Sequence, residues 1–371
     1  MWEKITETLY TFFQQNKFSG IIIGIVSFII IVPLSFTDTY NNFELNLYDV
    51  RFRIKPSIPE WDRLYFVDID ENSTAALGQF PWTRDIHAAA LQEFKAIGVD
   101  QVAFDVMFPD PSPAQLDPDA FKAIDEKVSA KKKVTKEEVA SLVKNNDRLF
   151  SQGVKQNGAV VLSYTFSADP LTPDTVEKQK SRDFQNALKR FSDVSSIPVP
   201  KGREKEFDSL DDKETVAIVY PIPELMYSAK TFGFVNRDTD IDGTIRRVRL
   251  VQVFQGRIYF NLALSMLIDM CGMKMENVEV NPGKNIILKN AFNSMLHKHE
   301  DIIIPIDKQG IIYVNWAGPG PREKSFHILP YFALLEYPNF VDGVYEFFDS
   351  VGGAEGIQRR AELRGAIASL E

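Results

Sequence analysis

The segment Phe18–Phe36, FSGIIIGIVSFIIIVPLSF, carries no charged side chain, whereas the rest of the chain has the mixed composition of a water-soluble fold. A run of about 19 apolar residues is long enough to cross a bilayer core as a helix. A cleaved signal peptide has a shorter apolar core, of about 7–15 residues, followed by small residues. The segment Thr37–Tyr40 that follows here suits cleavage poorly. We therefore predict a retained transmembrane helix at residues 18–36 after a cytoplasmic segment, residues 1–17. A signal sequence and a buried soluble helix are the alternatives.

The composition limits the classes of partner and site. Of 371 residues, 44% are hydrophobic and 25% are charged, as in packed globular domains. The net charge of −9 argues against nucleic acid as a partner. The single cysteine, Cys271, excludes an internal disulfide and a cysteine-rich zinc site, and four histidines are too few for a histidine-rich metal centre.

Beyond the apolar run, the sequence predicts a strand–helix–strand unit. Residues 64–69 (LYFVDI) and 101–108 (QVAFDVMF) are short apolar runs, as expected of strands buried on both faces. Between them, Thr83 and Asp85 suit the start of a helix and Gly98 suits its end. We expect the two strands to be adjacent, parallel and joined by a right-handed crossover.

The remaining segments complete a mixed α/β (α+β) fold class, with a mixed sheet flanked by helices. Two polar inserts interrupt the pattern. Residues 110–148 include KKKVTKEEVASLVKNND, which we interpret as one exposed helix, and residues 167–213 are typical of a mobile surface excursion. Further strands are predicted at 158–166, 232–236, 244–254, 285–288, 302–306 and 311–315, with a hairpin loop at 307–310, a helix at 261–270 and a helix-prone end at 355–371.

Several motifs occur in an order that resembles a known family. They are YDVRFR (48–53), FVDIDENS (66–73), LGQFPWTRDIHAAAL (77–91), GVDQVAFDVMF (98–108), FGFVNRDTDIDGTIRRVRL (232–250) and IYVNWAGP (312–319). Together they resemble the CHASE2 sensory domain, an extracytoplasmic input module of bacterial transmembrane receptors. The resemblance covers residues 44–350 in patches and leaves the two polar inserts unmatched.

The resemblance implies a sensor anchored in the bacterial inner membrane, with its main domain, residues 37–350, in the periplasm. Such receptors carry a cytoplasmic output, a class III nucleotide cyclase or a kinase, which acts through paired subunits, so a homodimer is expected. We interpret the chain as a truncated receptor that ends in a helical segment, residues 351–371, and has no catalytic domain. The stimulus, a small molecule or a protein, is not named by the sequence. No cofactor is expected in this chain, and Mg²⁺ or Mn²⁺ would belong to the output domain.

Four residues are candidates for a ligand-binding site: Asp70, Arg84, Asp105 and Trp82. The two carboxylates follow or lie within the predicted parallel strands, whose carboxyl ends form ligand crevices in open α/β sheets. Arg84 opens the helix between them and would reach both. The alternative is a structural ion pair, with Trp82 as a core residue. We expect His87, one turn into that helix, to pack or cap rather than catalyse.

Asp238, Asp240 and Asp242, followed by Gly243, reproduce the first half of a calcium-binding loop. The twelfth position is Arg249, where the full motif has a bidentate Glu. A tight turn explains the same spacing, because Asp and Gly favour turns. The arginines at 246, 247 and 249 have the pattern of an exposed strand face, suited to lipid headgroups or a partner subunit.

Two other functions remain open at this stage. A membrane-tethered periplasmic hydrolase would use Asp70 and Asp105 with a divalent metal, and this requires the carboxylates to converge on an open cleft. An envelope structural or interaction protein would use its inserts to bind partners.

Overall fold

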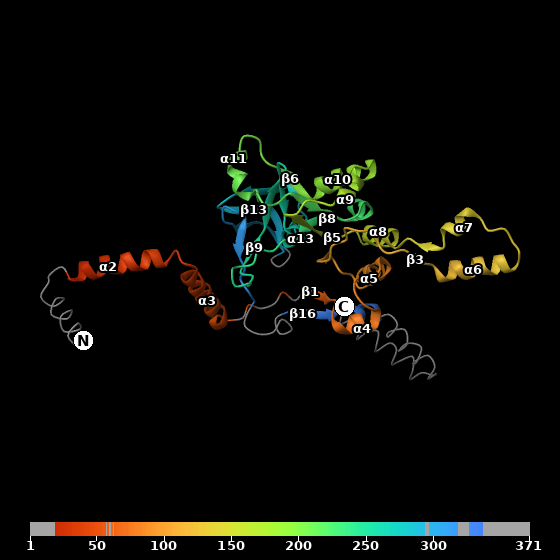
Figure 1. Cartoon of the computed structure of the whole chain (residues 1–371), viewed down its shortest axis with the longest axis horizontal. Helices are drawn as coiled ribbons and strands as arrows, with labels where there is room; N and C mark the ends of the chain where they lie inside the picture. Colours follow the sequence, from red (N-terminus) through yellow and green to blue (C-terminus); the bar gives the residue numbers. More distant parts are fainter. Residues whose placement is uncertain are drawn as a thin grey trace. The chain divides into compact units, whose positions relative to one another are not determined.

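The computed structural model describes residues 19–56, 58, 61, 63–293, 297–317 and 326–336 (Figure 1). The chain divides into two units. The first contains the residues up to Leu64 together with Thr239–Thr244 and Asn315–His327, and the second contains Tyr65–Asp238, Ile245–Val314 and the chain from Ile328. The predicted helix at 355–371 lies outside the described residues.

The first unit contains α2 (Ser19–Leu34) and α3 (Asp38–Ile54). Residues 35–37 separate them, and Thr37 caps α3, its hydroxyl accepting a hydrogen bond from the Tyr40 amide at 3.3 Å. The apolar run therefore folds as a helix of 16 residues that contains Pro33. Within the described ranges, no single helix has both the length and the apolar character needed to span a membrane. Residues 20–34 and 38–54 meet that test only as a pair, bent by 88°.

The largest sheet of the second unit is built around β5 (Val160–Ser167), whose residues are almost all buried. It pairs in parallel with β2 (Val102–Phe104) and β8 (Thr231–Phe234), and antiparallel with β7 (Ala217–Val219). A side chain on Gly233 of β8 would stand 2.3 Å from the Leu262 Cα, so glycine allows α13 (Leu262–Met270) to pack directly on the sheet.

The first predicted strand does not join this sheet. β1 (Tyr65–Asp68) pairs with β16 (His327–Pro330), and α5 (Arg84–Ala96) leads from that small sheet to β2. The prediction of adjacent parallel strands at 64–69 and 101–108 is therefore wrong. A short apolar run predicts a buried strand, but it does not identify the partner strand, and here β16 lies more than 250 residues along the chain.

Smaller antiparallel sheets form the second half of the unit. Val251–Phe254 (β10) pairs with Arg257–Phe260 (β11) across a tight turn at Gln255 and Gly256, which both have positive φ. The other pairings are β11 with β6 (Ser196–Pro198), β12 (Val278–Asn281) with β13 (Asn285–Asn293), β13 with β14 (Lys298–Pro305), and β9 (Arg247–Arg249) with β15 (Ile311–Tyr313). Residues 307–310 connect β14 to β15, which lie in different sheets, so the predicted hairpin there is wrong.

The first insert does not form a single helix. It contains β3 (Gln115–Leu116), α6 (Pro118–Ser129), α7 (Lys136–Ala140), β4 (Val143–Lys144) and the start of α8 (Asn146–Asn157). Thr135 caps α7 with a capping box, and Asn145 caps α8, so two cap residues interrupt the segment that we expected to be continuous.

The second insert forms α9 (Pro173–Gln179), α10 (Arg182–Ser195), β6, α11 (Glu204–Phe207) and the 3₁₀ turn η1 (Asp208–Leu210). The prediction of a mobile excursion is wrong, because this insert contributes buried residues to two core clusters. These are Phe184, Ala187 and Phe191 in the cluster around β5, and Ile197, Phe207 and Leu210 in the cluster around β10 to β13.

Candidate functional site

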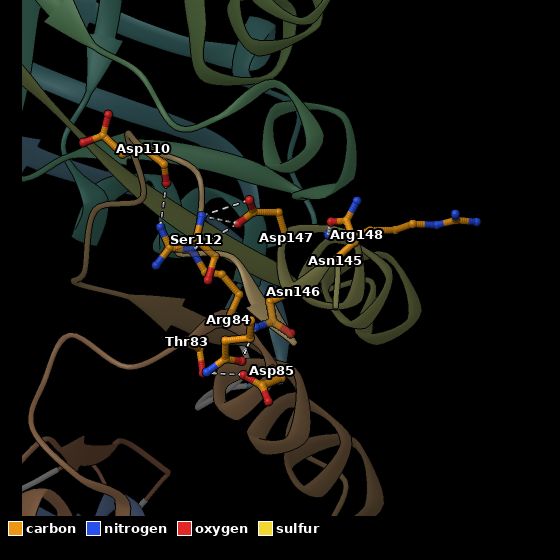
Figure 2. A network of polar contacts seen from close by, with 10 residues as sticks. Thr83, Arg84, Asp85, Asp110, Ser112, Asn145, Asn146, Asp147 and Arg148 are labelled. Carbon is orange, nitrogen blue, oxygen red and sulfur yellow. Dashed lines mark hydrogen bonds and ion pairs between the residues drawn. The ribbon is translucent and has the colours of Figure 1, made fainter. Parts of the chain in front are cut away.

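Arg84, the first residue of α5, is the predicted site residue with the most specific surroundings (Figure 2). It is 9% exposed, and its guanidinium lies over the Phe108 ring, 4.5 Å from the centroid. Its Nη2 donates to the Asp110 carbonyl at 2.9 Å, and its Nε lies 3.6 Å from Asp147 Oδ1. Burial lowers the pKa of Arg84, and the Asp147 carboxylate opposes that shift.

Asp147 lies in the first turn of α8 and holds the start of the first insert. Both of its oxygens accept from the Ser112 amide, at 3.1 and 2.9 Å. The neighbouring Asn146 donates from Nδ2 to Gln115 Oε1 at 2.7 Å. Figure 2 shows Arg84 of α5 and Asp147 of α8 lying beside Ser112, in the segment after β2.

Three buried polar atoms of this network have no hydrogen-bond partner among the described residues. They are Arg84 Nε, Ser112 Oγ and Asn146 Oδ1. Buried polar groups are normally satisfied by protein or by ordered water. The cluster therefore has the donors and acceptors needed to bind a water molecule or a small polar group.

A second ion pair involves Asp85, the next residue in the first turn of α5. Lys144 Nζ lies 2.7 Å from Asp85 Oδ2, and Thr83 Oγ1 donates to Asp85 Oδ1 at 2.5 Å. Burial acts to raise the pKa of Asp85, but the bonds from Lys144 and Thr83 outweigh it and lower the pKa. Both ends of the first insert are thus bonded to α5, one through Asp110 and the other through Lys144 and Asp147.

His87, one turn further along α5, is 1% exposed and enclosed by aromatic rings. Its Nδ1 lies 2.8 Å from the Tyr331 hydroxyl. The rings around it, with centroids 5.5 to 6.2 Å away, belong to Trp82, Phe104, Phe108, Phe150 and Tyr331. Burial lowers the pKa of His87 to about 4, and the Arg84 charge adds to the effect. His87 is therefore a neutral core residue, in line with our expectation that it packs.

The other predicted site residues do not meet at Arg84. Asp70 caps α4 (Glu71–Leu77), its Oδ1 accepting from the Ser73 amide at 2.8 Å and the Ser73 hydroxyl at 2.5 Å. These bonds, the hydroxyl first, lower the pKa of Asp70. Trp82 is 4% exposed and donates to the Gly78 carbonyl at 2.7 Å, which is the arrangement of a core residue.

Asp105 follows β2 and is an exposed residue, although neighbouring atoms remove enough water to raise the pKa of its carboxyl. Arg237 acts in the opposite direction. In the described ranges the carboxylate paired with Arg84 is Asp147, not Asp70 or Asp105. The sequence did not indicate this partner because Asp147 lies 63 positions away, at the far end of the first insert.

The acidic segment 238–242 has the contacts of a turn. The Gly243 amide donates to the Asp240 carbonyl at 2.8 Å, and the Thr244 amide donates to Asp242 Oδ1 at 3.0 Å. Asp238 pairs with Arg249 at 3.4 Å. Within the described ranges no group of three or more His, Cys, Asp or Glu side chains is arranged to hold a metal ion.

The predicted arginine face is also only partly exposed. Arg246 is 1% exposed and is among the largest buried side chains, and Arg247 and Arg249 are half-buried. The prediction of an exposed strand face is therefore wrong for Arg246.

The contacts of Arg84 and His87 are suited to fixing the position of α5 in the domain. They fix α5 to α8, to the ends of the first insert and, through Tyr331, to the segment after β16. Residue types alone did not reveal the His87 cluster, because its members come from four separate places in the chain, residues 82–87, 104–108, 150 and 331.

Comparison with known proteins gives one positive result. No curated protein and no solved structure matches the chain. The family model of the CHASE2 domain, in contrast, matches residues 25–355. That match covers most of the chain, and the protein therefore belongs to the CHASE2 family of extracytoplasmic sensory domains.

Proposed function

We propose that this chain is the sensory input of a bacterial membrane receptor, attached to the inner membrane by α2, with residues 37–350 in the periplasm. The observation that carries the proposal is the CHASE2 match, which starts inside α2 and continues to residue 355.

The character of α2 supports membrane attachment. It is apolar on all sides, and large side chains such as Ile21, Phe28 and Ile29 are about two-thirds exposed, at 60%, 66% and 62%. A helix of this kind is stable in lipid or in a protein core. At 1.5 Å per residue its length is about 24 Å, a few ångströms less than a typical bilayer core, a mismatch that local thinning accommodates.

We further propose that the domain controls a cytoplasmic output, a class III nucleotide cyclase in the first place and a kinase otherwise, as a homodimer. A stimulus shifts such an equilibrium only if it binds one conformation better than the other. The Arg84 network supports a sensing role, since it joins three segments and leaves polar atoms available. We expect the purified chain by itself to leave ATP and GTP unchanged with Mg²⁺ or Mn²⁺.

Cysteine accessibility tests the topology. In a Cys271→Ala background, Lys132→Cys places an exposed thiol in the first insert, and Lys4→Cys adds a thiol to the amino-terminal sequence. We expect a membrane-impermeant maleimide to label the variant at 132 in intact spheroplasts and the variant at 4 only after lysis. Labelling in the reverse order would place the domain in the cytoplasm and refute the proposal.

The hydrolase alternative gains no support from a specific observation. It required Asp70 and Asp105 to converge, and Asp70 is engaged in capping α4.

A further inference from the structure

Strands β1 and β16 form a sheet of their own, which lies beside α4 (Figure 1). The chain passes from the first unit into the second at Tyr65, where β1 begins, and again at Ile328, within β16. This small sheet therefore joins the start of the second unit to residues 328–336, the last part of that unit that the structure describes.

Residues 331–336, directly after β16, are helical, and the start of this helix is held by α4. The first amide groups of a helix have no partner within the helix. The Phe332 amide finds one outside it, donating to Ser73 Oγ at 3.1 Å. Ser73 is fully buried and donates its own hydroxyl to Asp70 Oδ1 at 2.5 Å. Asp70, which the sequence suggested as a ligand-binding residue, therefore orients the hydroxyl that holds this helix.

Tyr331 joins the same helix start to α5. Its hydroxyl lies 2.8 Å from His87 Nδ1, and its ring centroid lies 5.0 Å from that of Trp82. Leu334 and Leu335, further along the helix, are partly buried against the same apolar cluster. Residues 328–336 are thus held by one hydrogen bond to α4, one to α5 and a small packed cluster.

This cluster is separate from the two large core clusters of the second unit. Among the described residues its buried members are Trp82, Ala90 and Tyr331, whereas the cluster around β5 has buried residues from β2, β5, β7, β8, α8 and α10. Segments that bury little apolar surface open at a lower free energy than the whole domain. We therefore expect residues 328–336 to open locally while the main core stays folded.

The Arg84 network reaches this segment through α5. Arg84 and His87 lie one turn apart on α5 and share the Phe108 ring. The Arg84 guanidinium lies 4.5 Å from the Phe108 centroid, and the His87 ring lies edge-on to it at 5.5 Å. A change in the contacts of Arg84 therefore alters the surroundings of His87, the side chain that holds Tyr331.

We propose that four residues form a latch that holds residues 328–336 closed on α4 and α5, and that the contacts of Arg84 set how often it opens. The residues of the latch are Ser73, His87, Tyr331 and Phe332. This inference rests on the proposed function, because only in a receptor does the segment lead on to an output. A stimulus then acts by binding the closed or the open form better than the other.

Hydrogen exchange of the full chain in nanodiscs, measured by mass spectrometry, tests the latch. Ser73→Ala removes the acceptor of the Phe332 amide and should make exchange of residues 328–336 at least tenfold faster. The matched control is Thr74→Ala, which removes a hydroxyl that donates to the Glu71 carbonyl inside α4. The control should leave exchange of residues 328–336 unchanged.

A mild change in the main core shows whether the latch opens by itself. Ile218→Val removes one methylene from the cluster around β5 and should speed the exchange of β5 severalfold, because those amides exchange when the whole domain opens. Exchange of residues 328–336 should stay as in the wild type, since their local opening leaves Ile218 packed. An equal increase in both segments would show that residues 328–336 open only with the whole domain, and this would refute the latch.

The same measurement tests the coupling to Arg84. Arg84→Met should change the exchange rate of residues 328–336 by at least threefold, and this effect should disappear when Tyr331→Phe is also present, because the hydroxyl near His87 is then absent. Exchange that Arg84→Met leaves unchanged, or an effect that persists with Tyr331→Phe, would refute coupling through the latch. The maleimide experiment is independent, so a cytoplasmic domain that gives the expected exchange would refute the topology and leave the latch intact.

Discussion

The two polar inserts resemble each other in sequence but differ in structure. In the first, no residue of α6 or α7 is buried, and the exposed side chains include Phe121, Val128 and Val139 at 56%, 58% and 54%. In the second, α10 buries Phe184, Ala187 and Phe191. Figure 1 shows α6 and α7 at the end of an arm, whereas α10 lies beside the sheet strands of the same unit.

Helices α6 and α10 both carry the spacing of apolar residues that is typical of an amphipathic helix. Phe121, Ile124 and Val128 of α6 follow the three–four spacing of an amphipathic helix, as do Phe184, Ala187 and Phe191 of α10. The difference is the partner. Phe191 packs against Phe232 of β8 with tilted rings and edge-on against Tyr164 of β5, at 4.8 and 5.1 Å between centroids. Amphipathic spacing thus predicts that a face is able to pack, and the rest of the chain determines whether it does.

Among single substitutions, the largest expected difference between the inserts is the response to truncation of a phenylalanine. Phe191→Ala should lower the free energy of unfolding by about 3–5 kcal/mol, because it leaves a cavity among packed rings. Phe121→Ala removes an exposed ring and should change it by no more than about 0.5 kcal/mol. Denaturant unfolding in the same detergent measures the free energy of unfolding of both variants. Equal losses would show that α6 is as well packed as α10.

The two ends of the first insert are buried, although α6 and α7 are not. His87 packs there against Phe108 and Phe150, so its pKa tests that burial. The pKa of His87 falls from 6.5 to about 4 on folding, so the folded protein keeps it neutral. Between those values the unfolded chain binds a proton that the folded protein does not. The free energy of unfolding is therefore highest, as far as His87 affects it, above about pH 6.5. It falls as the pH falls toward 4, by about 3 kcal/mol in all.

Measuring the free energy of unfolding between pH 4 and 7 checks this expectation. The matched control is the double variant His87→Phe and Tyr331→Phe, which removes both polar partners and leaves no buried orphan. In the double variant, the part of the pH dependence that comes from His87 should be absent between pH 4 and 7. A wild-type profile that is no steeper than that of the double variant would show that His87 titrates as an exposed residue does.

The sequence predicted the elements of this fold better than their pairing. Continuous apolar runs identified β5 and the strand that became β1, and the helix predicted at 261–270 is α13, which Asn261 caps. The β1–β16 pairing and the contact of Arg84 with Asp147 join residues separated by long inserts. Local propensity carries no information on such contacts, so the sequence assigned Asp70 and Asp105 to Arg84, whereas the carboxylate paired with it in the structure is Asp147.

Removal of Arg84 should have an intermediate effect. Arg84→Met keeps the packing over Phe108 but leaves Asp147, with a side chain 15% exposed, without its cation. We expect a loss of about 2 kcal/mol, below the range for fully buried pairs, because the Ser112 amide still donates to both carboxylate oxygens. Lys144→Met breaks the more exposed pair with Asp85 and should cost less than about 1 kcal/mol. Equal effects on the unfolding midpoint would contradict the distinction between the two ion pairs.

The smallest effect is expected from removing the body of the first insert altogether. Leu116 pairs with Val143, and the Asp117 amide donates to the Leu142 carbonyl at 2.8 Å, so residues 117 and 142 already lie opposite each other at the end of a two-stranded ladder. An Asn-Gly turn in place of residues 118–141 closes that ladder as a two-residue hairpin. The deleted residues include no buried side chain, and the ion pair between Lys127 and Glu138 is lost whole, without leaving a buried charge. The free energy of unfolding should therefore change by no more than about 1 kcal/mol.

The corresponding removal of residues 182–195 from the second insert should prevent folding, because it takes Phe184, Ala187 and Phe191 out of the core. If the first deletion also unfolds the protein, α6 and α7 stabilise the domain through contacts that their exposure does not indicate.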